Sequence, residues 1–206
     1  MRAFAAIDLP EALRAELGRR QALFRSSLVK VQEDGNIGVR WVHPEGIHLT
    51  LKFLGELPEI KSAQVIAALS ALGAFPRFNV EIQGFGFFPD SRKPRVFWVG
   101  VIAPPSLAEL AARVDAAMAK LGFSPEKRNF SPHLTLARFN TTRPQASLES
   151  LARECGASSI GQFEVHEFSL FESRLRAGAP AEYRKLACFP QPGPFIAGNS
   201  SVKAGI

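Results

Sequence analysis

The sequence predicts an α+β protein built as two related lobes. Segments that alternate like half-buried strands take turns with segments whose apolar residues recur at helical spacing. The tetrapeptide His-Leu-Thr-Leu occurs twice, at residues 48–51 and 133–136, 85 positions apart. Phe78 follows the first histidine by 30 residues, and Phe163 follows the second by the same number. Because only two copies exist, the repeat indicates a duplicated unit and not a solenoid.

The first half of the chain predicts three strands and two helices. Residues 2–7 alternate as a strand, and Pro10 fits the first turn of a helix that includes residues 13–24. A polar, glycine-containing loop follows, and a Pro-Glu-Gly turn precedes the first motif strand. The later elements are strands over residues 39–42 and 47–54 and a helix over residues 58–72.

The second half repeats this alternation. A polar turn at residues 89–94 separates two apolar strands, and two prolines open an alanine-rich helix. The expected elements are strands over 78–88 and 96–102, a helix over 106–121, the second motif strand, a weaker helix over about 145–154, and strands over 163–171 and 183–189. Residues 1–190 are thus expected to form one bilobal domain, with a flexible Gly-, Pro-, Ser- and Ala-rich tail at 191–206.

Composition limits the possible partners and the compartment. With 25 basic and 19 acidic residues the net charge is +6, which favours anionic partners, although scattered charges also fit an ordinary solvated surface. Cys155 and Cys188 form no metal or redox motif, which favours free thiols in the cytoplasm. We find neither a signal-peptide pattern nor an apolar run long enough to span a membrane, and expect a soluble monomer.

The repeated tetrapeptide places a histidine and a threonine on one face of each motif strand, because side chains alternate along a strand. His48 therefore shares a face with Thr50, and His133 with Thr135, while the leucines face a core. Two imidazoles that titrate near neutrality suit acid and base work on a phosphate ester, where one protonates the leaving oxygen and the other activates water. The threonine hydroxyls would hold the non-bridging oxygens.

Two cations are candidates for stabilising the charge on the phosphate. Lys52 shares the face of His48 by simple alternation. Arg138 does not share the face of His133 and would need a bulge to reach the phosphate. Its planar guanidinium suits phosphate oxygens better than an ammonium does.

We also considered structural roles for the histidines and other kinds of catalytic site. A single His-x-Thr on a strand is more often a cross-strand hydrogen-bonding pair, but a structural role has no need to repeat the hydroxyl with the histidine. His43 is expected in an exposed turn, and His166 on a strand is expected to be structural. The sequence offers no third ligand at zinc spacing, no nucleophile motif and no phosphate-binding Gly-rich loop. We therefore expect chemistry without metal or cofactor.

The residues then match a known family. The chain resembles the two-histidine (2H) phosphoesterases, and among them the bacterial RNA 2′,3′-cyclic phosphodiesterases, also called 2′-5′ RNA ligases. The matching blocks are residues 2–10, 39–42, 48–55, 94–98, 131–138 and 171–175. Phe171 departs from the tyrosine of many relatives, and the tail from residue 191 has no recognised counterpart.

The resemblance implies a bilobal fold with two antiparallel sheets that line a cleft, with helices outside. It implies hydrolysis of 2′,3′-cyclic phosphates on RNA ends or nucleotides to 2′-phosphates, with His48 as proton donor, His133 as proton acceptor and Arg138 favoured over Lys52. The two halves are nearly interchangeable, so the residues alone leave the order of acid and base open. RNA ligation as the reverse reaction, a non-catalytic RNA-end or nucleotide-binding module, and action on a small cyclic metabolite remain alternatives.

Overall fold

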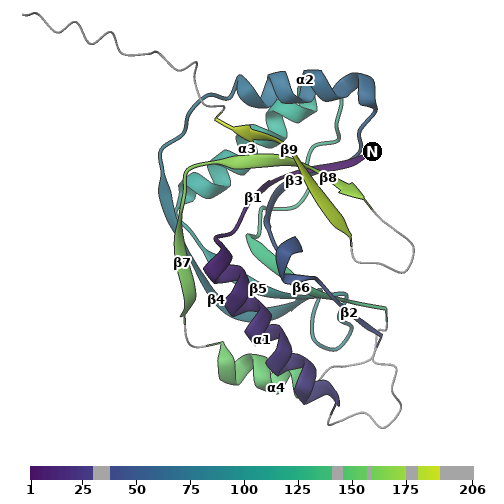
Figure 1. Ribbon diagram of the computed structural model, residues 1–206, viewed down its shortest axis with the longest axis vertical. Helices are drawn as coiled ribbons and strands as arrows, with labels where there is room; N and C mark the ends of the chain where they lie inside the picture. Colours follow the sequence, from purple (N-terminus) through teal and green to yellow (C-terminus); the bar gives the residue numbers. More distant parts are fainter. Residues whose placement is uncertain (30–37, 141–145, 157–158, 175–180, 191–206) are drawn as a thin grey trace, which may run out of the picture.

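Figure 1 shows the computed structural model, which describes residues 1–29, 38–140, 146–156, 159–174 and 181–190. The strands are β1 (Arg2–Ile7), β2 (Val39–Trp41), β3 (Leu49–Glu56), β4 (Phe78–Phe88), β5 (Val96–Ile102), β6 (His133–Phe139), β7 (Ser159–Val165), β8 (Phe168–Arg174) and β9 (Glu182–Phe189). The helices are α1 (Glu11–Val29), α2 (Glu59–Ser70), α3 (Pro105–Lys120) and α4 (Ala146–Cys155), with a short 3-10 helix, η1 (Pro44–Gly46), before β3.

The strands form one antiparallel sheet in the order β7-β4-β5-β6-β3-β1-β8-β9, and β2 pairs with β6 beside this path. The two motif strands, β3 and β6, meet at its centre through the pair Leu49–Leu134. The α+β prediction is therefore confirmed. The two predicted sheets are the two halves of one sheet, β3-β1-β8-β9 and β6-β5-β4-β7.

Helices cover each half of the sheet, and two of them come from the opposite half. The helix α1 follows β1 but packs with α4 on the half that contains β4 and β7. The helix α3 follows β5 but packs with α2 on β3. Figure 1 shows the two helix pairs at opposite ends of the molecule, with the motif strands between them.

The motif leucines face the core, as predicted. Leu49, Leu134 and Leu136 are fully buried and Leu51 is nearly so. Burying one leucine side chain contributes about 1.5–3 kcal/mol, so the repeated leucines fix the face that each motif strand turns inward. That choice leaves the histidines and threonines on the opposite face.

The structure corrects one predicted element. The single strand expected over residues 163–171 is two strands, β7 and β8, separated at His166 and Glu167. The separation is required because β7 pairs with β4, whereas β8 pairs with β1 and β9 in the other half of the sheet. The expectation of a flexible tail falls on residues outside the described ones. None of the helices in the described ranges is long and apolar enough to cross a membrane.

Candidate active site

The first motif strand contains a bulge directly after its threonine. In the pairing with β1, Thr50 and Lys52 lie opposite consecutive residues, so Leu51 is an extra residue in β3. A bulge of this kind reverses the alternation of the side chains that follow it. The next residue on the face of His48 is therefore Phe53 and not Lys52.

The prediction that Lys52 shares the face of His48 is consequently wrong. Its side chain is buried among the residues packed behind the sheet, and it has only 6% of its surface exposed. The Nζ atom lies 2.5 Å from Oδ1 of Asp115 on α3 and donates a hydrogen bond of 2.8 Å to the carbonyl oxygen of Ser124. Lys52 ties α3 to the sheet and does not face the cleft.

The second motif strand contains the same bulge. In the pairing with β5, Thr135 and Ala137 lie opposite consecutive residues, so Leu136 is the extra residue of β6. The bulge brings Arg138 onto the face of His133, which meets the condition that the sequence set for this arginine. Its side chain is exposed and lines a pocket of about 530 Å³ together with His48, Thr50 and Thr135.

The pairing of the two motif strands brings both motifs to one place. Leu49 lies opposite Leu134, and continuing this antiparallel register places His48 opposite Thr135 and His133 opposite Thr50. His133 thus lies beside the residues that line the pocket. His48 and His133 are diagonal neighbours on the two strands. Residues in this relation are about 7–8 Å apart along the backbone of a regular antiparallel pair. A phosphate group between them would have a histidine and a threonine on each side.

Both histidine rings are oriented by the same backbone contact. Nδ1 of His48 lies 2.8 Å from the carbonyl oxygen of Gly46, and Nδ1 of His133 lies 2.8 Å from that of Ser131. A carbonyl can only accept a hydrogen bond, so Nδ1 carries a proton in each ring. The other ring nitrogen, Nε2, is therefore the atom that can exchange a proton with a substrate.

Aromatic side chains surround His48. Phe4 stacks on its imidazole at 4.4 Å between ring centroids, and Tyr183 contacts it edge-on at 5.1 Å. Burial lowers the pKa of His48 to about 4, while the carbonyl oxygen of Gly46 and the charge of Asp8 act in the opposite direction. In the free enzyme at neutral pH the imidazole of His48 is therefore neutral.

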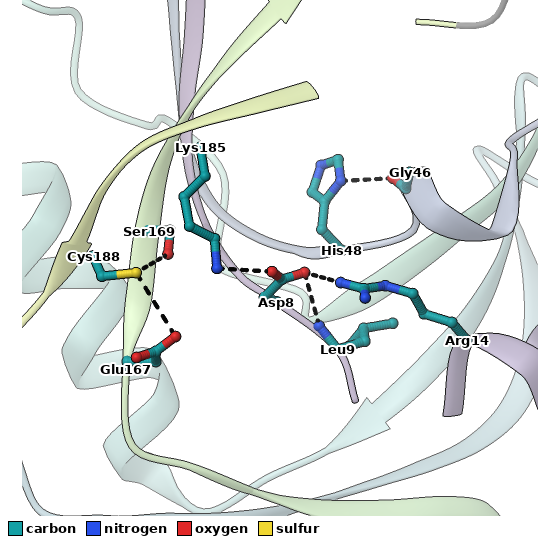
Figure 2. Close-up of polar contacts among 9 residues, drawn as sticks. All are labelled: Asp8, Leu9, Arg14, Gly46, His48, Glu167, Ser169, Lys185 and Cys188. Carbon is teal, nitrogen blue, oxygen red and sulfur yellow. Dashed lines mark hydrogen bonds and ion pairs between the residues drawn. The ribbon is translucent and has the colours of Figure 1, made fainter. Parts of the chain in front are cut away.

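A charged cluster lies behind His48 (Figure 2). The carboxylate of Asp8 forms ion pairs with Arg14 and with Lys185, whose Nζ is 3.0 Å away, and accepts a hydrogen bond from the backbone N–H of Leu9. A second hollow of about 210 Å³ is lined by these three charged side chains and by His48. Within this cluster Asp8 favours protonation of the imidazole of His48, whereas Arg14 disfavours it.

Several residues that line the pocket were not predicted as site residues. Arg40, Phe53 and Tyr183 line it, and so does His43, whose side chain is exposed as expected for a turn. A signal for Phe53 was present, because it follows His48 by five residues, as Arg138 follows His133. Tyr183, which β9 brings to the cleft, follows Trp98 by 85 residues, the spacing of the two motif histidines.

The other residues considered from the sequence lie outside the larger pocket. Phe171 is buried and stacks on Phe4 at 5.3 Å, so it supports the ring beneath His48. His166 is exposed where the chain passes from β7 to β8. Within the described residues, no three His, Cys, Asp or Glu side chains gather as a metal site, and Cys155 and Cys188 are free thiols.

Comparisons with known proteins agree with this arrangement. Residues 36–176 match the 2′-5′ RNA ligase superfamily. The RNA 2′,3′-cyclic phosphodiesterase of Methanothermobacter thermautotrophicus is 35% identical over 181 residues, which cover 87% of this chain and 94% of that protein. The chain belongs to the 2′-5′ RNA ligase superfamily, whose members are two-histidine phosphoesterases.

Solved structures show the same fold. A protein of Thermus thermophilus superposes with a TM-score of 0.70 at 29% identity, over 92% of this chain and 97% of that one. E. coli LigT complexed with 3′-AMP superposes with a TM-score of 0.70 at 26% identity, over 91% of this chain and 96% of that one.

Proposed function

We propose that the protein hydrolyses 2′,3′-cyclic phosphates, on RNA ends or on nucleotides, to 2′-phosphomonoesters. The observation that carries the proposal is the register of the motif strands, which places His48 opposite Thr135 and His133 opposite Thr50 on one face. Relatives named RNA 2′,3′-cyclic phosphodiesterases, 35% identical in one case, support it.

The threonines and Arg138 would hold the phosphate. The hydroxyls of Thr50 and Thr135 donate hydrogen bonds to the two non-bridging oxygens, and the guanidinium of Arg138 stabilises the charge that develops on them. These groups leave the proton transfers to the two histidines.

The asymmetry of the pocket orients the nucleotide. Along β3, Phe53 lies beyond Thr50 and so at the end nearer His133, whereas Arg138 lies at the end nearer His48. Phe53 is 63% exposed and offers its ring to a base, which every nucleotide can use for stacking. A base is attached at C1′, next to C2′, so a base on Phe53 directs O3′ toward His48.

This orientation assigns the proton transfers. His133 takes a proton from water, which attacks phosphorus in line with the leaving O3′. The P–O3′ bond breaks, O3′ receives the proton from Nε2 of His48, and the phosphate stays on O2′. His48 is neutral in the free enzyme, but an anionic phosphate beside its ring favours the protonated form. Each transfer contributes about 10²–10⁴-fold.

Turnover of 2′,3′-cyclic AMP in EDTA tests the proposal, with the product identified by phosphorus NMR. We expect 2′-AMP from the wild type and a loss of about 10²–10⁴-fold in kcat/KM for His48→Ala and for His133→Ala. His166→Ala removes an exposed histidine away from the pocket and is the matched control. Full activity in either motif variant would overturn the mechanism, and 3′-AMP as product would overturn the orientation.

Three further properties belong to the proposal. The reaction needs no metal or nucleotide cofactor, because two histidines supply both proton transfers. The protein acts as a monomer in the cytoplasm, where its free thiols stay reduced. In ligation a 5′-hydroxyl replaces water as the nucleophile: its oxygen attacks phosphorus, the P–O3′ bond breaks, and a 2′-5′ linkage forms. Rates on paired RNA fragments with and without a 5′-hydroxyl would measure the share of this reaction.

A further inference from the structure

Two arginines face each other at one end of the pocket. Arg40 of β2 lies directly opposite Arg138 of β6 in an antiparallel pair, so both side chains stand on the same face of the sheet. Both are exposed and both line the pocket. An anion bound between the two side chains would reduce the repulsion between like charges that stand directly opposite each other.

The lining of the pocket is basic. It contains Arg2 as well as the arginine pair, and no aspartate or glutamate among the described residues that form it. Both charges of the pair act on the phenol of Tyr183. Burial raises the pKa of this phenol, while Arg138 and Arg40 act to lower it. Both guanidinium groups therefore act on the interior of the cleft and not only on the solvent outside it.

One phosphate does not need both guanidinium groups together with two histidines and two threonines. In the orientation proposed above, the base lies toward Phe53 and C3′ toward Arg138. The 5′ chain leaves the ribose at C4′, next to C3′, so it runs toward the arginine end of the pocket. Directly opposed residues have Cβ atoms about 4.5–5.5 Å apart, so Arg40 lies beside Arg138 at this end of the pocket, one strand spacing across the sheet.

We propose that Arg40 forms a second phosphate subsite, which binds the phosphodiester on the 5′ side of the terminal nucleotide. This inference rests on the proposed function and names its substrate class: an RNA end of at least two nucleotides, in preference to a cyclic mononucleotide. Arg138 holds the cyclic phosphate and Arg40 holds the next phosphate along the chain. A planar guanidinium can bind two oxygens of that phosphodiester at once.

Three substrates separate this role from a general effect of charge. They are 2′,3′-cyclic AMP, the dinucleotide ApA with a 2′,3′-cyclic end, and the same dinucleotide with an uncharged methylphosphonate linkage. In the wild type we expect the charged dinucleotide to have the highest kcat/KM. Arg40→Gln should lower that value by about 10- to 100-fold, the contribution of a charge-assisted hydrogen bond, and bring it to that of the methylphosphonate. Arg40→Lys should restore part of it.

Arg2→Gln is the matched control, because Arg2 lines the same pocket but lies opposite Glu56, beyond the Phe53 end. It should affect the three substrates alike. An equal loss on all three substrates in Arg40→Gln, or no loss, would overturn the subsite while leaving the proposed function in place. A wild type that turns over none of them would overturn the proposed function itself. Thermal unfolding of each variant checks that the short strand β2 remains paired.

Discussion

Phe53 and Arg138 occupy equivalent positions in the two halves of the protein, each five residues after its motif histidine and two residues past a bulge. The same backbone device therefore presents an aromatic ring at one end of the cleft and a guanidinium at the other. The histidines and threonines repeat almost without change. The histidines and threonines are thus arranged symmetrically, and the residues that follow them at the two ends of the cleft are not.

Replacing Phe53 should weaken nucleotide binding without affecting the fold. Its ring is 63% exposed, so little core packing is lost. Stacking of a base on an aromatic side chain contributes about 1–3 kcal/mol, which predicts a fall of about 5- to 150-fold in kcat/KM for Phe53→Ala on 2′,3′-cyclic AMP. Phe53→Trp should retain activity. Ile60→Ala removes another exposed apolar side chain, on α2, and should leave the rate unchanged.

Lys52 should matter for stability and not for turnover. Its ion pair with Asp115 lies behind the sheet, so Lys52→Met leaves a carboxylate that is only 25% exposed without its partner. We expect a loss of about 1–3 kcal/mol in the free energy of unfolding, measured with urea, and a kcat/KM within about twofold of the wild type. Asp115→Asn should lower stability in the same way. A loss of activity at unchanged stability would contradict this placement.

The difference between Lys52 and Arg138 shows what local sequence can and cannot predict. Alternation correctly placed the motif histidines, threonines and leucines, because a buried face requires a strict period of two. Alternation failed for the residues that follow each bulge, because a bulge depends on the register with β1 or β5, and these strands are distant in sequence. The sequence could state only that Arg138 needed a bulge. The corresponding bulge in β3 places Lys52 on the face opposite to His48 and Thr50.

The places of residues on strands that are distant in sequence could not be predicted for a related reason, because they depend on which strands pair. Trp98 and Tyr183 are 85 positions apart, the same spacing as the two motif histidines. In the sheet Trp98 lies on β5, beside its motif strand, whereas Tyr183 lies on β9 at the edge of the other half. The chain passes between the halves after β7, so strand order and sequence order differ. Each ring nevertheless lies beside a motif histidine, Trp98 beside His133 and Tyr183 beside His48, and only the strand pairing shows this.

Burial of His48 predicts a pH-dependent stability. Its folded pKa of about 4 is below its usual value of 6.5, so the unfolded chain binds the proton more tightly. The contribution is complete above pH 6.5 and is lost as the pH falls toward 4, which amounts to about 3 kcal/mol. The difference in unfolding free energy between wild type and His48→Gln should therefore change over that window. The exposed His166→Gln should track the wild type, and parallel curves for all three proteins would contradict the prediction.

Asp8 should act through His48 as a positioning residue. Its carboxylate favours the protonated imidazole, and it also offsets the charges of Arg14 and Lys185 in the hollow behind the ring. Asp8→Asn leaves Glu45 as the only acidic side chain among the described residues that line the hollow, so the negative charge near the two cations falls and both changes disfavour protonation of His48. We expect the pKa of His48, measured by NMR titration, to fall below about 4 and kcat to fall more than KM changes, because the proton donor is harder to charge.

Glu16→Gln provides the control for this effect. Glu16 also pairs with two arginines, Arg19 and Arg20, but on a partly exposed stretch of α1 outside both pockets. Its loss should leave the titration of His48 and kcat unchanged. If Asp8→Asn lowered only thermal stability and left the pKa of His48 in place, Asp8 would be a structural ion-pair partner. A fall in that pKa together with kcat is the result that ties the charged cluster behind the ring to proton donation in the cleft.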